Sequence, residues 1–392
     1  MSVPSVSISA RAARRLALGH PWVYRSDIED DHGCASGDVV AVEKRHGRGG
    51  TNSLGWAFYS RDSLIVLRMI SRGGEIPARA FFRDRLAAAI EARRGLQGAD
   101  TAGRLVFAES DGLPGLIVDR YADAVVMQTL CAGTERLKDL FADCLQESLA
   151  PRALIERNDV AVRRLEGLDQ KSGLLRGELA EPVTVEIGGL SLPVYPLQGQ
   201  KTGAFLDQRE NQIAAAVYAR GHCLDAFCYQ GWFGLQLARG GAAEVTLVDQ
   251  SAQALEIARE SGAANNLRVE TVAANVFDFL TERDRAGQRY DMVVLDPPAF
   301  AKNKRALAGA LRGYKEINLR AMRLLAAGGI LVSCSCSYHL SMDMFEEVLA
   351  SAATDSGRNV QIMERRGQAR DHPERLGFPE SRYLKCFILR VS

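Results

Sequence analysis

The sequence lacks both a long apolar run and an excess of charge of one sign. No apolar stretch approaches the roughly 18 residues that a helix needs to cross a bilayer, so no membrane span is predicted. The 49 Lys and Arg residues are balanced by 48 Asp and Glu residues, and the total charge therefore indicates no particular partner. An RNA contact would require basic residues that are gathered locally.

Cysteine pairs with metal-type spacing are also lacking. The eight cysteines are scattered along the chain, apart from Cys334 and Cys336, and this spacing predicts no metal site. Scattered cysteines in a chain of this length are typical of a reduced, cytoplasmic protein. Arg11, Arg14 and Arg15 near the N-terminus are followed by no apolar segment, so a secretory signal is not expected.

A chain of 392 residues exceeds what one hydrophobic core usually holds, and its pattern changes twice. Residues 1–72 contain short alternating runs separated by turn residues, which is typical of a small β-barrel. Residues 73–183 mix helical periods with strands and indicate an α+β domain. Residues 184–392 alternate strand and helix, and this order predicts a parallel, doubly wound α/β sheet. We therefore expect three domains with these boundaries.

Individual elements follow from the same patterns. The predicted helices are 11–18, 79–96, 134–149, 235–239, 253–265 and 310–325. The predicted strands of the first two domains are 3–8, 39–43, 55–59, 65–70, 105–108, 116–118, 125–129, 154–157 and 160–164. The predicted strands of the third domain are 223–227, 244–249, 268–273, 292–295, 330–336 and 385–391.

A turn with a glycine follows the first strand of the third domain. The chain runs from Asp225 through Phe227 and Tyr229 to Gly231 and then enters a helix. Gly231 permits a ligand to approach the backbone closely, but the turn has too few glycines for the pyrophosphate of a dinucleotide. Asp249 ends the next strand, where a carboxylate can bind both ribose hydroxyls, or else cap the following helix. Together with the later Asp-Pro-Pro motif, this order of loop and acid predicts an unphosphorylated nucleoside cofactor, S-adenosylmethionine (SAM), and hence a methyltransferase.

The fourth strand of this domain ends in Asp296-Pro297-Pro298-Ala-Phe300, a rigid acidic turn. Such a turn presents a carboxylate and backbone carbonyls to a planar base, and Phe300 is available to stack on that base. The motif by itself also suits methylation of an exocyclic amine, which needs no protein nucleophile. The simpler structural alternative is a strand-ending turn with a packing Phe.

The two close cysteines indicate which chemistry the site performs. Cys334 and Cys336 lie on one face of the next strand, with Cys336 nearer the cofactor edge. Pyrimidine C5 is a poor nucleophile, so a thiolate must add to C6 before C5 can accept a methyl group. A cysteine beside the base has no use in amine methylation. The pattern therefore favours Cys336 as nucleophile, with Cys334 as buried packing and Cys228 as a weaker candidate.

With these residues the chain resembles the class I rRNA cytosine-C5 methyltransferases of the RlmI type, which modify large-subunit ribosomal RNA. The resemblance covers the whole chain and begins with a PUA-like domain. The motifs that carry it are Gly19-His-Pro-Trp-Val-Tyr24, Glu109-Ser-Asp-Gly-Leu-Pro-Gly115, Lys201-Thr-Gly-Ala-Phe-Leu-Asp-Gln-Arg209, Asp296-Pro-Pro-Ala-Phe300, Ser335-Cys336-Ser337, Asp371-His-Pro and Tyr383-Leu-Lys385.

The resemblance implies a Rossmann-like catalytic domain, SAM as cofactor and a flipped cytosine as substrate. It makes Cys336 the nucleophile and Asp296 the partner of the cytosine N3 and N4 edge. The residues expected to bind the cofactor are Asp225, Phe227, Tyr229, Gly231, Asp249, Gln250, Asn275, Asp296, Phe205, Gln208 and Arg209. The residues expected to bind RNA are Pro297, Pro298 and Phe300 at the base, and Arg11, Arg14, Arg15, Trp22 and Arg25 in the PUA-like domain.

Three positions depart from related proteins. Gln230 and Trp232 stand where the family usually has Thr and Gly, which changes the fit around the cofactor. Ala299 stands where other RNA cytosine methyltransferases carry a second cysteine. The sequence therefore assigns no group to the removal of the C5 proton, since neither Asp296 nor His339 is a clear choice.

The sequence thus predicts a SAM-dependent enzyme that forms 5-methylcytosine in large-subunit rRNA. Thiolate chemistry serves both pyrimidines, so 5-methyluridine as product stays open. Two further alternatives are an exocyclic-amine RNA methyltransferase and an RNA-binding assembly factor without catalysis. We expect rRNA as partner, a cytoplasmic location, and neither a metal nor a membrane contact; the oligomeric state is left open, with a homodimer as one option.

Overall fold

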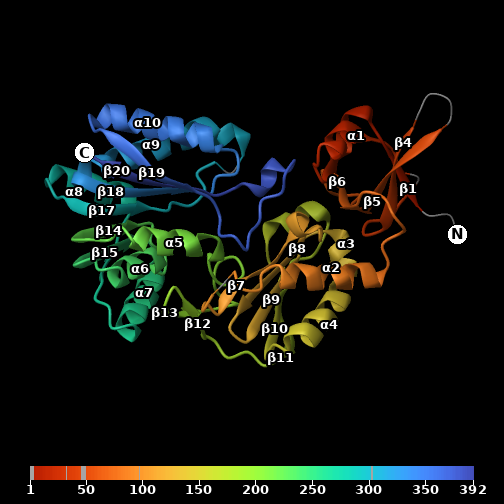
Figure 1. Ribbon diagram of the computed structural model, residues 1–392, viewed down its shortest axis with the longest axis horizontal. Helices are drawn as coiled ribbons and strands as arrows, with labels where there is room; N and C mark the ends of the chain where they lie inside the picture. The colour runs from red at the N-terminus through yellow and green to blue at the C-terminus, as the bar shows by residue number, and fades with distance from the viewer. Residues whose placement is uncertain (1–3, 32, 46–49, 97, 302) are drawn as a thin grey trace. The chain divides into compact units, whose positions relative to one another are not determined.

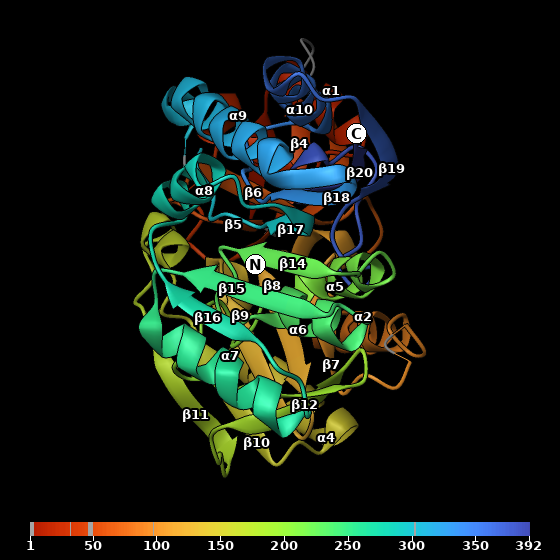
Figure 2. The same cartoon turned by 90° about the vertical axis from the view of Figure 1, so that its left-hand side faces the viewer.

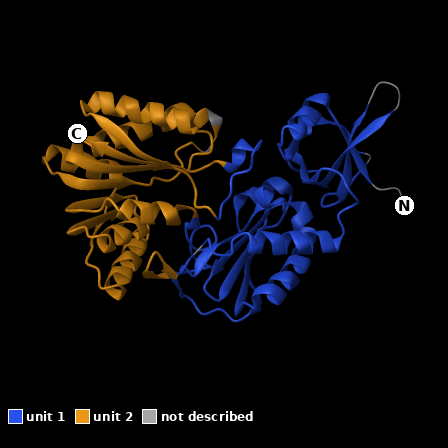
Figure 3. Cartoon of the chain, viewed as in Figure 1, with its two compact units in different colours: residues 1–185, 194–206, 371–381 blue, residues 186–193, 207–370, 382–392 orange. Residues whose placement is uncertain are grey.

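The structure is a computed structural model that describes residues 4–392 except 32, 46–49, 97 and 302. Contacts divide the chain into two compact units, which Figure 3 colours separately. The first unit comprises residues 1–185, 194–206 and 371–381, and the second comprises 186–193, 207–370 and 382–392. The barrel and the α+β region therefore share the first unit, and a short segment from near the end of the chain belongs to it as well.

Six strands at the start of the chain form one curled sheet (Figure 1). Its edge strands β2 and β3 are joined by a turn of three residues, Arg25–Asp27, so the sheet must curl until its edges approach each other. Its inner side chains share a core with helix α1, Ala10–Ala17, which Ser9 caps by accepting a hydrogen bond from the Ala12 N–H. In sheet order the strands are β2 Trp22–Tyr24, β6 Ile65–Ser71, β5 Thr51–Tyr59, β4 Val39–Arg45, β1 Ser5–Ile8 and β3 Ile28–Asp30.

The small barrel that the sequence predicts is confirmed. Of the strand predicted over 3–8, residue 3 lies outside the described residues, and the rest corresponds to β1. Strands β2 and β3 are missing from the prediction, because three residues are too few to show an alternating pattern.

The α+β region of the first unit packs a five-stranded sheet against helices. Its strands are, in sheet order, β11 Ser172–Gly177, β10 Ala153–Arg157, β9 Ala124–Thr129, β8 Leu116–Tyr121 and β7 Ala102–Phe107. Its helices are α2 Arg79–Glu91, α3 Ala132–Arg136 and α4 Lys138–Leu149. Phe58 of β5 stacks on Phe82 of α2, with ring centroids 5.6 Å apart, and both side chains are buried in one cluster. The barrel and the α+β region therefore share a core.

One predicted strand of this region is wrong. Residues 160–164 do not form a strand but begin a 3-10 helix, Ala161–Glu166. The turn carries the Arg163 side chain inward while Arg164 stays exposed, so tertiary contacts outweigh the local alternation. The helix predicted over 134–149 is interrupted at Leu137, whose φ of −98° and ψ of 7° lie outside the helical range.

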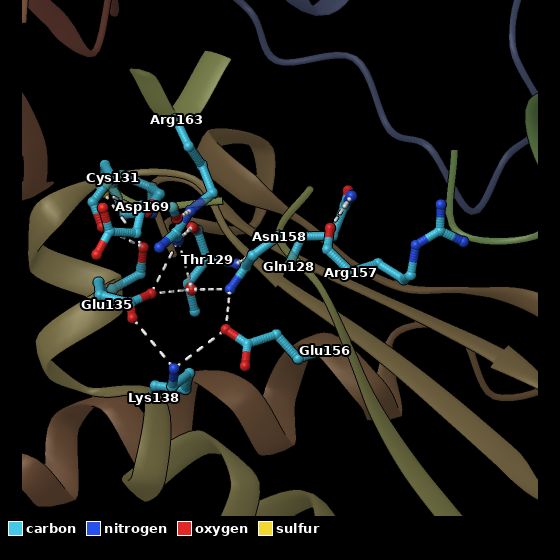
Figure 4. A network of polar contacts seen from close by, with 12 residues as sticks. Gln128, Thr129, Cys131, Glu135, Lys138, Glu156, Arg157, Asn158, Arg163 and Asp169 are labelled. Atoms are coloured by element: carbon cyan, nitrogen blue, oxygen red, sulfur yellow. Dashed lines mark hydrogen bonds and ion pairs between the residues drawn. The ribbon is translucent and has the colours of Figure 1, made fainter. Parts of the chain in front are cut away.

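A buried polar network anchors the end of β9 to this turn (Figure 4). Arg163 is 1% exposed, donates hydrogen bonds to the carbonyl and hydroxyl oxygens of Thr129, and forms an ion pair of 2.9 Å with Glu135. Lys138 lies 3.1 Å from carboxylate oxygens of both Glu135 and Glu156. Burial raises the pKa of Glu135, but hydrogen bonds from Arg163, Thr129 and Lys138 outweigh it and lower that pKa to about 2.

We predict that Arg163→Met lowers the free energy of unfolding of the first unit by about 3–5 kcal/mol, because Thr129 and Glu135 lose the buried guanidinium that binds both of them. Arg164→Met is the matched control, since the side chain of this exposed neighbour bonds only to Gln170 among the described residues, and it is expected to cost less than about 0.5 kcal/mol. Urea denaturation of both variants measures the difference. Equal stability of the two variants would contradict the assigned role of Arg163.

The sheet of the second unit has seven strands. In sheet order they are β16 Glu270–Ala273, β15 Glu244–Asp249, β14 His222–Ala226, β17 Tyr290–Leu295, β18 Leu325–Ser335, β20 Lys385–Val391 and β19 Val360–Arg366. Figure 2 shows β16, β15, β14, β17 and β18 one after another across the sheet. These five pair in parallel, whereas β20 runs antiparallel to both of its neighbours.

Helices cover both faces of this sheet. Alternate residues of β14 point to opposite faces: Cys223 lies in one core and Leu224 in the other. The first core includes side chains of α5 Arg209–Ala216, α6 Trp232–Arg239 and α7 Ala252–Ala264. The second includes side chains of α8 Val276–Arg285, α9 Leu307–Leu324 and α10 Met342–Ser356. The predicted doubly wound α/β fold is confirmed, with the correction that the last strand is antiparallel.

Two further strands, β12 Val183–Ile187 and β13 Leu190–Val194, pair with each other and were not predicted. In the part of the chain that the structure describes, no helix combines the length and apolarity that crossing a membrane requires.

Candidate active site

The carboxyl ends of the parallel strands in the second unit meet at one edge. Ala226 at the end of β14 pairs with Val248 of β15 and with Leu295 of β17, and Leu295 pairs with Ser333 of β18. Strand order reverses at β14, which lies between β15 and β17. Ligands of doubly wound sheets bind beyond the carboxyl ends at such a reversal. The loops that leave this edge carry most of the predicted cofactor and base residues.

The loop after β14 has an unusual backbone. Phe227, Tyr229 and Gly231 have φ values of 64°, 49° and 74°, in the left-handed region that non-glycine residues rarely adopt. A Cβ atom on Gly231 would lie 2.8 Å from Cδ1 of Leu247, so only glycine lets the loop pack this closely on β15. The Tyr229 N–H donates a 2.9 Å hydrogen bond to Asp249 Oδ2, which joins the loop to the end of the neighbouring strand.

Asp249 positions this loop rather than capping helix α7. The helix is capped by Ser251, whose Oγ accepts a hydrogen bond of 3.2 Å from the Ala254 N–H. Asp249 Oδ1 accepts a 2.9 Å hydrogen bond from the Ser251 N–H, and its side chain stays half-buried. Gln250 beside it is exposed.

Asp225 is a buried acid at the centre of this edge. It is 1% exposed, and its Oδ2 accepts a 2.8 Å hydrogen bond from the Gly234 N–H. Its Oδ1 has no hydrogen-bond partner among the described residues. Burial raises the pKa of Asp225 to about 8, the Gly234 N–H acts against this rise, and the nearby carboxylates of Asp296 and Asp249 add to it. A ligand that carries positive charge or hydrogen-bond donors would relieve this unfavourable arrangement.

Asn275 follows β16 and begins helix α8. Its side-chain oxygen caps the helix by accepting hydrogen bonds from the N–H groups of Phe277, at 2.9 Å, and Asp278, at 3.4 Å. The adjacent Ala274 N–H donates a 3.0 Å hydrogen bond to the Asp249 carbonyl, which holds the start of this loop beside the end of β15. Asn275 thus lies at the predicted cofactor edge and is exposed there.

The acidic turn after β17 is tied to α5. Asp296 Oδ1 accepts a 2.9 Å hydrogen bond from Gln208 Nε2, and the buried Gln208 in turn accepts one of 2.7 Å from Asn211. Asp296 is partly exposed, and of the two prolines after it Pro297 is buried and Pro298 exposed. The turn therefore holds its carboxylate in a fixed orientation at the strand edge.

Phe300 lies in an aromatic cluster. Its ring centroid is 4.6 Å from that of Tyr314, 6.0 Å from that of Phe277 and 6.5 Å from that of Phe227. Phe300 is partly buried against the core, so much of its ring serves packing, as the simpler structural alternative expects. Its remaining exposed surface lies beside the acidic turn.

Cys336 differs from the other cysteines in its exposure. All eight lie in the described part of the chain; seven are buried, whereas Cys336 is partly exposed directly after β18. Its Sγ is 4.0 Å from the carbonyl oxygen of Pro297, so the thiol adjoins the acidic turn. Cys334 pairs in register with Cys386 of β20 and is fully buried, and burial raises its pKa. Cys334 is therefore packed in the core and Cys336 is the accessible thiol, while the role of Cys336 as nucleophile stays a prediction.

A buried lysine lies near this thiol. Lys385, which begins β20, is 2% exposed, and its Nζ donates hydrogen bonds of 2.7 Å to the Ser337 carbonyl and 2.8 Å to the Tyr383 carbonyl. Burial lowers the pKa of Lys385 to about 8, while the charge of Cys336 acts in the opposite direction. The sequence pattern alone gives Lys385 no role in the chemistry, although a lysine at the start of the apolar run Cys-Phe-Ile-Leu signals a buried cation.

Two other predicted cofactor residues, Arg209 and Phe205, belong to different units. Arg209 begins α5 in the second unit and is 1% exposed. Phe205 belongs to the first unit, where the Lys201 ammonium lies 4.5 Å from the centre of its ring. A role for Phe205 at the cofactor remains a prediction.

The predicted RNA-binding arginines near the N-terminus lie on the barrel. Arg11 and Arg15 form ion pairs of 2.8 and 3.6 Å with the buried Asp27. Arg25 donates a 2.8 Å hydrogen bond to the Ser63 carbonyl. Arg14 is exposed on α1. Arg11, Arg14 and Arg25 leave charge at the surface, so they stay candidates for phosphate contacts.

Trp22 is held within the first unit. Its Nε1 donates a 2.8 Å hydrogen bond to Glu109, and its ring packs edge-on against Phe378, with centroids 4.7 Å apart. The guanidinium of Arg68 lies 5.5 Å from its centre. These contacts describe a residue that fixes the barrel to its neighbours. Stacking of Trp22 on a base remains a prediction that these contacts do not favour.

Profiles of two protein families match the chain. The PUA-like domain profile matches residues 6–72, and the S-adenosylmethionine-dependent methyltransferase profile matches residues 125–377, more than half of the chain. The chain belongs to the S-adenosylmethionine-dependent methyltransferases. SAM is accordingly the cofactor of this methyltransferase, as the sequence predicts.

Relatives of this methyltransferase share nearly its whole length. The protein named ribosomal RNA large subunit methyltransferase I from Shewanella denitrificans is 43% identical over 389 residues, covering 96% of this chain and 97% of its own. The protein of that name from Aeromonas hydrophila has the same identity and coverage. The chain is therefore a member of their family.

Solved structures share the fold. A SAM-dependent methyltransferase from Streptococcus mutans has a TM-score of 0.84 and 20% identity, covering 99% of this chain and 100% of its own. A methyltransferase complexed with SAH has a TM-score of 0.85 at the same identity and coverage.

The residues at the strand edge fit SAM chemically. The carboxylates of Asp249 and Asp296 raise the pKa of Asp225, whose buried Oδ1 has no hydrogen-bond partner among the described residues. SAM carries a sulfonium cation and an ammonium group, which offset such a concentration of acid. Among the described residues no group of three or more His, Cys, Asp or Glu side chains could hold a metal ion.

We predict that Asp225→Asn changes how stability depends on pH. The pKa of Asp225 is raised to about 8 in the folded state, so the folded chain keeps a proton that the unfolded chain releases above about pH 4. The free energy of unfolding of the native chain therefore falls as pH rises from about 4 to 8. The asparagine variant has no such titrating group, so its stability does not fall in this way. The difference in melting temperature, variant minus native, should therefore be several degrees larger at pH 8 than at pH 5.

Thermal denaturation without SAM at pH 5, 6.5 and 8 measures this difference, with the exposed Asp278→Asn as control for loss of a carboxyl group. A difference between Asp225→Asn and the native chain that stays constant across pH would show that Asp225 is ionised throughout.

Proposed function

We propose that this methyltransferase forms 5-methylcytosine in large-subunit ribosomal RNA through a covalent bond between Cys336 and C6 of the base. One observation carries the proposal: Cys336, the partly exposed cysteine, adjoins the acidic turn that begins at Asp296. The names of the full-length relatives support large-subunit rRNA as the substrate. The PUA-like domain supports a contact with RNA.

The acidic turn suits recognition of a cytosine. A protonated carboxyl group can donate a hydrogen bond to N3, either directly or through a bound proton donor. An ionised carboxylate can accept a hydrogen bond from the N4 amine. Gln208 holds Asp296 by one oxygen, at 2.9 Å, which fixes the orientation of the other. Phe300 and the exposed Pro298 offer apolar surface beside a base that has left its stack.

The chemistry follows from the positions of the thiol and the lysine. The Cys336 thiolate adds to C6 of the cytosine, and C5 becomes electron-rich enough to attack a methyl group. SAM, when bound, supplies this methyl group as an electrophile. A base then removes the C5 proton, the bond between Sγ and C6 breaks, and the thiolate is restored. The buried ammonium of Lys385 lies near the Cys336 thiol, and its positive charge stabilises the thiolate.

The cofactor residues have separate tasks in this proposal. Asp249 binds the ribose hydroxyls, since its carboxylate stands at the end of β15 and already orders the loop after β14. The backbone of that loop, at Tyr229 and Gly231, lines the adenosyl group. Asp225 and Asp296 offset the positive charge of the sulfonium and ammonium groups. Gln250 and Asn275, exposed at the same edge, border the base of the cofactor.

We expect Cys336→Ala to reduce 5-methylcytosine formation in large-subunit rRNA by at least about 10³-fold, because C5 cannot be activated without the thiolate. Cys334→Ala is the matched control: this buried neighbour should retain most of the activity. The measurement is transfer of label from SAM, followed by digestion of the RNA to nucleosides.

An independent readout uses RNA in which cytosine is replaced by 5-fluorocytosine. Fluorine at C5 cannot leave as a proton does, so an adduct that survives denaturation should accumulate with the native chain and be absent with Cys336→Ala. Activity that persists in Cys336→Ala, or label on an exocyclic amine, would favour amine methylation by the acidic turn instead. Labelled 5-methyluridine would keep the thiolate chemistry but replace cytosine as the substrate.

We expect Lys385→Met to shift the acid limb of the pH profile of kcat/KM to higher pH. The lysine pKa of about 8 means that its ammonium stabilises the thiolate below pH 8 and is lost above it. The variant should therefore be about tenfold less active at pH 7, and native and variant should converge above pH 9. A uniform loss at every pH would indicate that Lys385 only supports the fold.

A further inference from the structure

A pocket lies within the first unit. It has a volume of about 510 Å³ and is lined by the end of β6, one face of α2, the turn before β8 and a residue of the 371–381 segment. Three of its lining residues are arginines: Arg72, Arg85 and Arg375. Arg375 is far from Arg72 and Arg85 in the sequence, so distant segments of the chain place positive charge at one cavity.

The charge of these arginines is not neutralised by carboxylates. Arg85 donates to two backbone carbonyls, those of Ile70 at 2.6 Å and Gly112 at 2.9 Å, and Arg375 donates to the Glu109 carbonyl at 2.6 Å. Among the described residues none of the three forms an ion pair. Carbonyl partners orient the guanidinium groups but leave their net charge in place.

The acids nearest the pocket have other partners. Both oxygens of Asp111 bind Arg93, at 2.6 and 2.8 Å. The carboxylate of Glu109 binds Trp22 and Arg68. The pocket therefore keeps an excess of positive charge.

The arginines also repel one another. Burial lowers the pKa of Arg85, and the charge of Arg375 lowers it further. The pKa of Arg375 is lowered by burial and by Arg72, although Glu109 opposes the fall. Like charges held together at such a cost indicate a site that an anion completes.

The shape of the pocket restricts the anion. Its floor is apolar, from Ile70, Ala88 and Ala89, while the arginines and two serines, Ser71 and Ser110, supply donors. An inorganic ion would fill a small part of 510 Å³. A phosphate with an attached sugar and base would use both kinds of surface, with the phosphate on the guanidinium groups and the sugar or base on the apolar floor.

We propose that the pocket lined by Arg72, Arg85 and Arg375 binds a backbone phosphate and adjoining nucleoside of the RNA substrate. This inference rests on the proposed function, since it takes RNA as the ligand. It assigns the first unit a contact with the sugar-phosphate backbone that is separate from the arginines of α1. Such a contact positions the RNA without reading its sequence.

The test measures binding of transcribed large-subunit rRNA to the full chain at several salt concentrations. Arg72→Gln is the main variant, because the Arg72 side chain is exposed and makes no hydrogen bond or ion pair with the described residues. Loss of one phosphate contact should weaken binding roughly five- to eightfold at 0.1 M salt and reduce the slope of log affinity against log salt by roughly 0.7–0.9. Arg72→Lys keeps the charge and should keep the slope.

Arg79→Gln is the matched control, since it removes an equally exposed arginine from the start of α2 that does not line the pocket. It should leave the slope unchanged. Adenosine monophosphate, titrated alone into the full chain, distinguishes RNA from a free nucleotide as the ligand. Under the proposal its binding is weak, because it offers one contact of the many that RNA makes.

Unchanged affinity and slope in Arg72→Gln would overturn the proposal. So would tight, saturable binding of adenosine monophosphate that the variant abolishes while RNA binding stays intact. Methyl transfer to the same RNA is measured separately. If no methyl group is transferred but Arg72→Gln still weakens RNA binding, the proposed reaction is contradicted and the assignment of the pocket is not.

Discussion

The packing of the turn after β14 on β15 is the constraint on which the catalytic unit depends. Gly231 lets the backbone approach Leu247 to a distance that a side chain would block, and Asp249 fixes the turn through the Tyr229 N–H. Because β14 lies where the strand order reverses, this turn stands at the position where doubly wound sheets bind their ligands. The acidic turn at Asp296 leaves the adjacent strand at the same edge.

Strain and buried charge accumulate at this edge. Phe227 and Tyr229 adopt left-handed backbone, Asp225 holds an unpaired carboxylate oxygen among the described residues, and Lys385 is a buried amine. Each arrangement costs stability in the free protein. Their concentration at one end of one sheet, with the accessible thiol of Cys336 beside them, is typical of an active site, where ligand binding offsets such costs.

The first unit is held together by a segment that the sequence places near the other end of the chain. Asp371 is fully buried, its side chain accepts a 3.0 Å hydrogen bond from the Arg104 N–H, and its carbonyl accepts hydrogen bonds from Arg93. Further along the segment, Glu380 pairs with His20. The 371–381 segment connects β19 to β20 without a crossover helix. A parallel strand would require such a helix, and β20 accordingly runs antiparallel to its neighbours.

The sequence by itself determined the class of fold, the cofactor and most regular elements, because alternation, helical period and strand-end motifs are local properties. The elements that it missed include β2 and β3, which are too short for a period, and α8 and α10, whose caps Asn275 and Ser341 were available signals. Tertiary structure alone decided which thiol is accessible, that Lys385 lies near it, that Ser251 rather than Asp249 caps α7, and that Arg72, Arg85 and Arg375 share a pocket. Burial and charge proximity depend on residues far apart in the chain, and no local pattern encodes them.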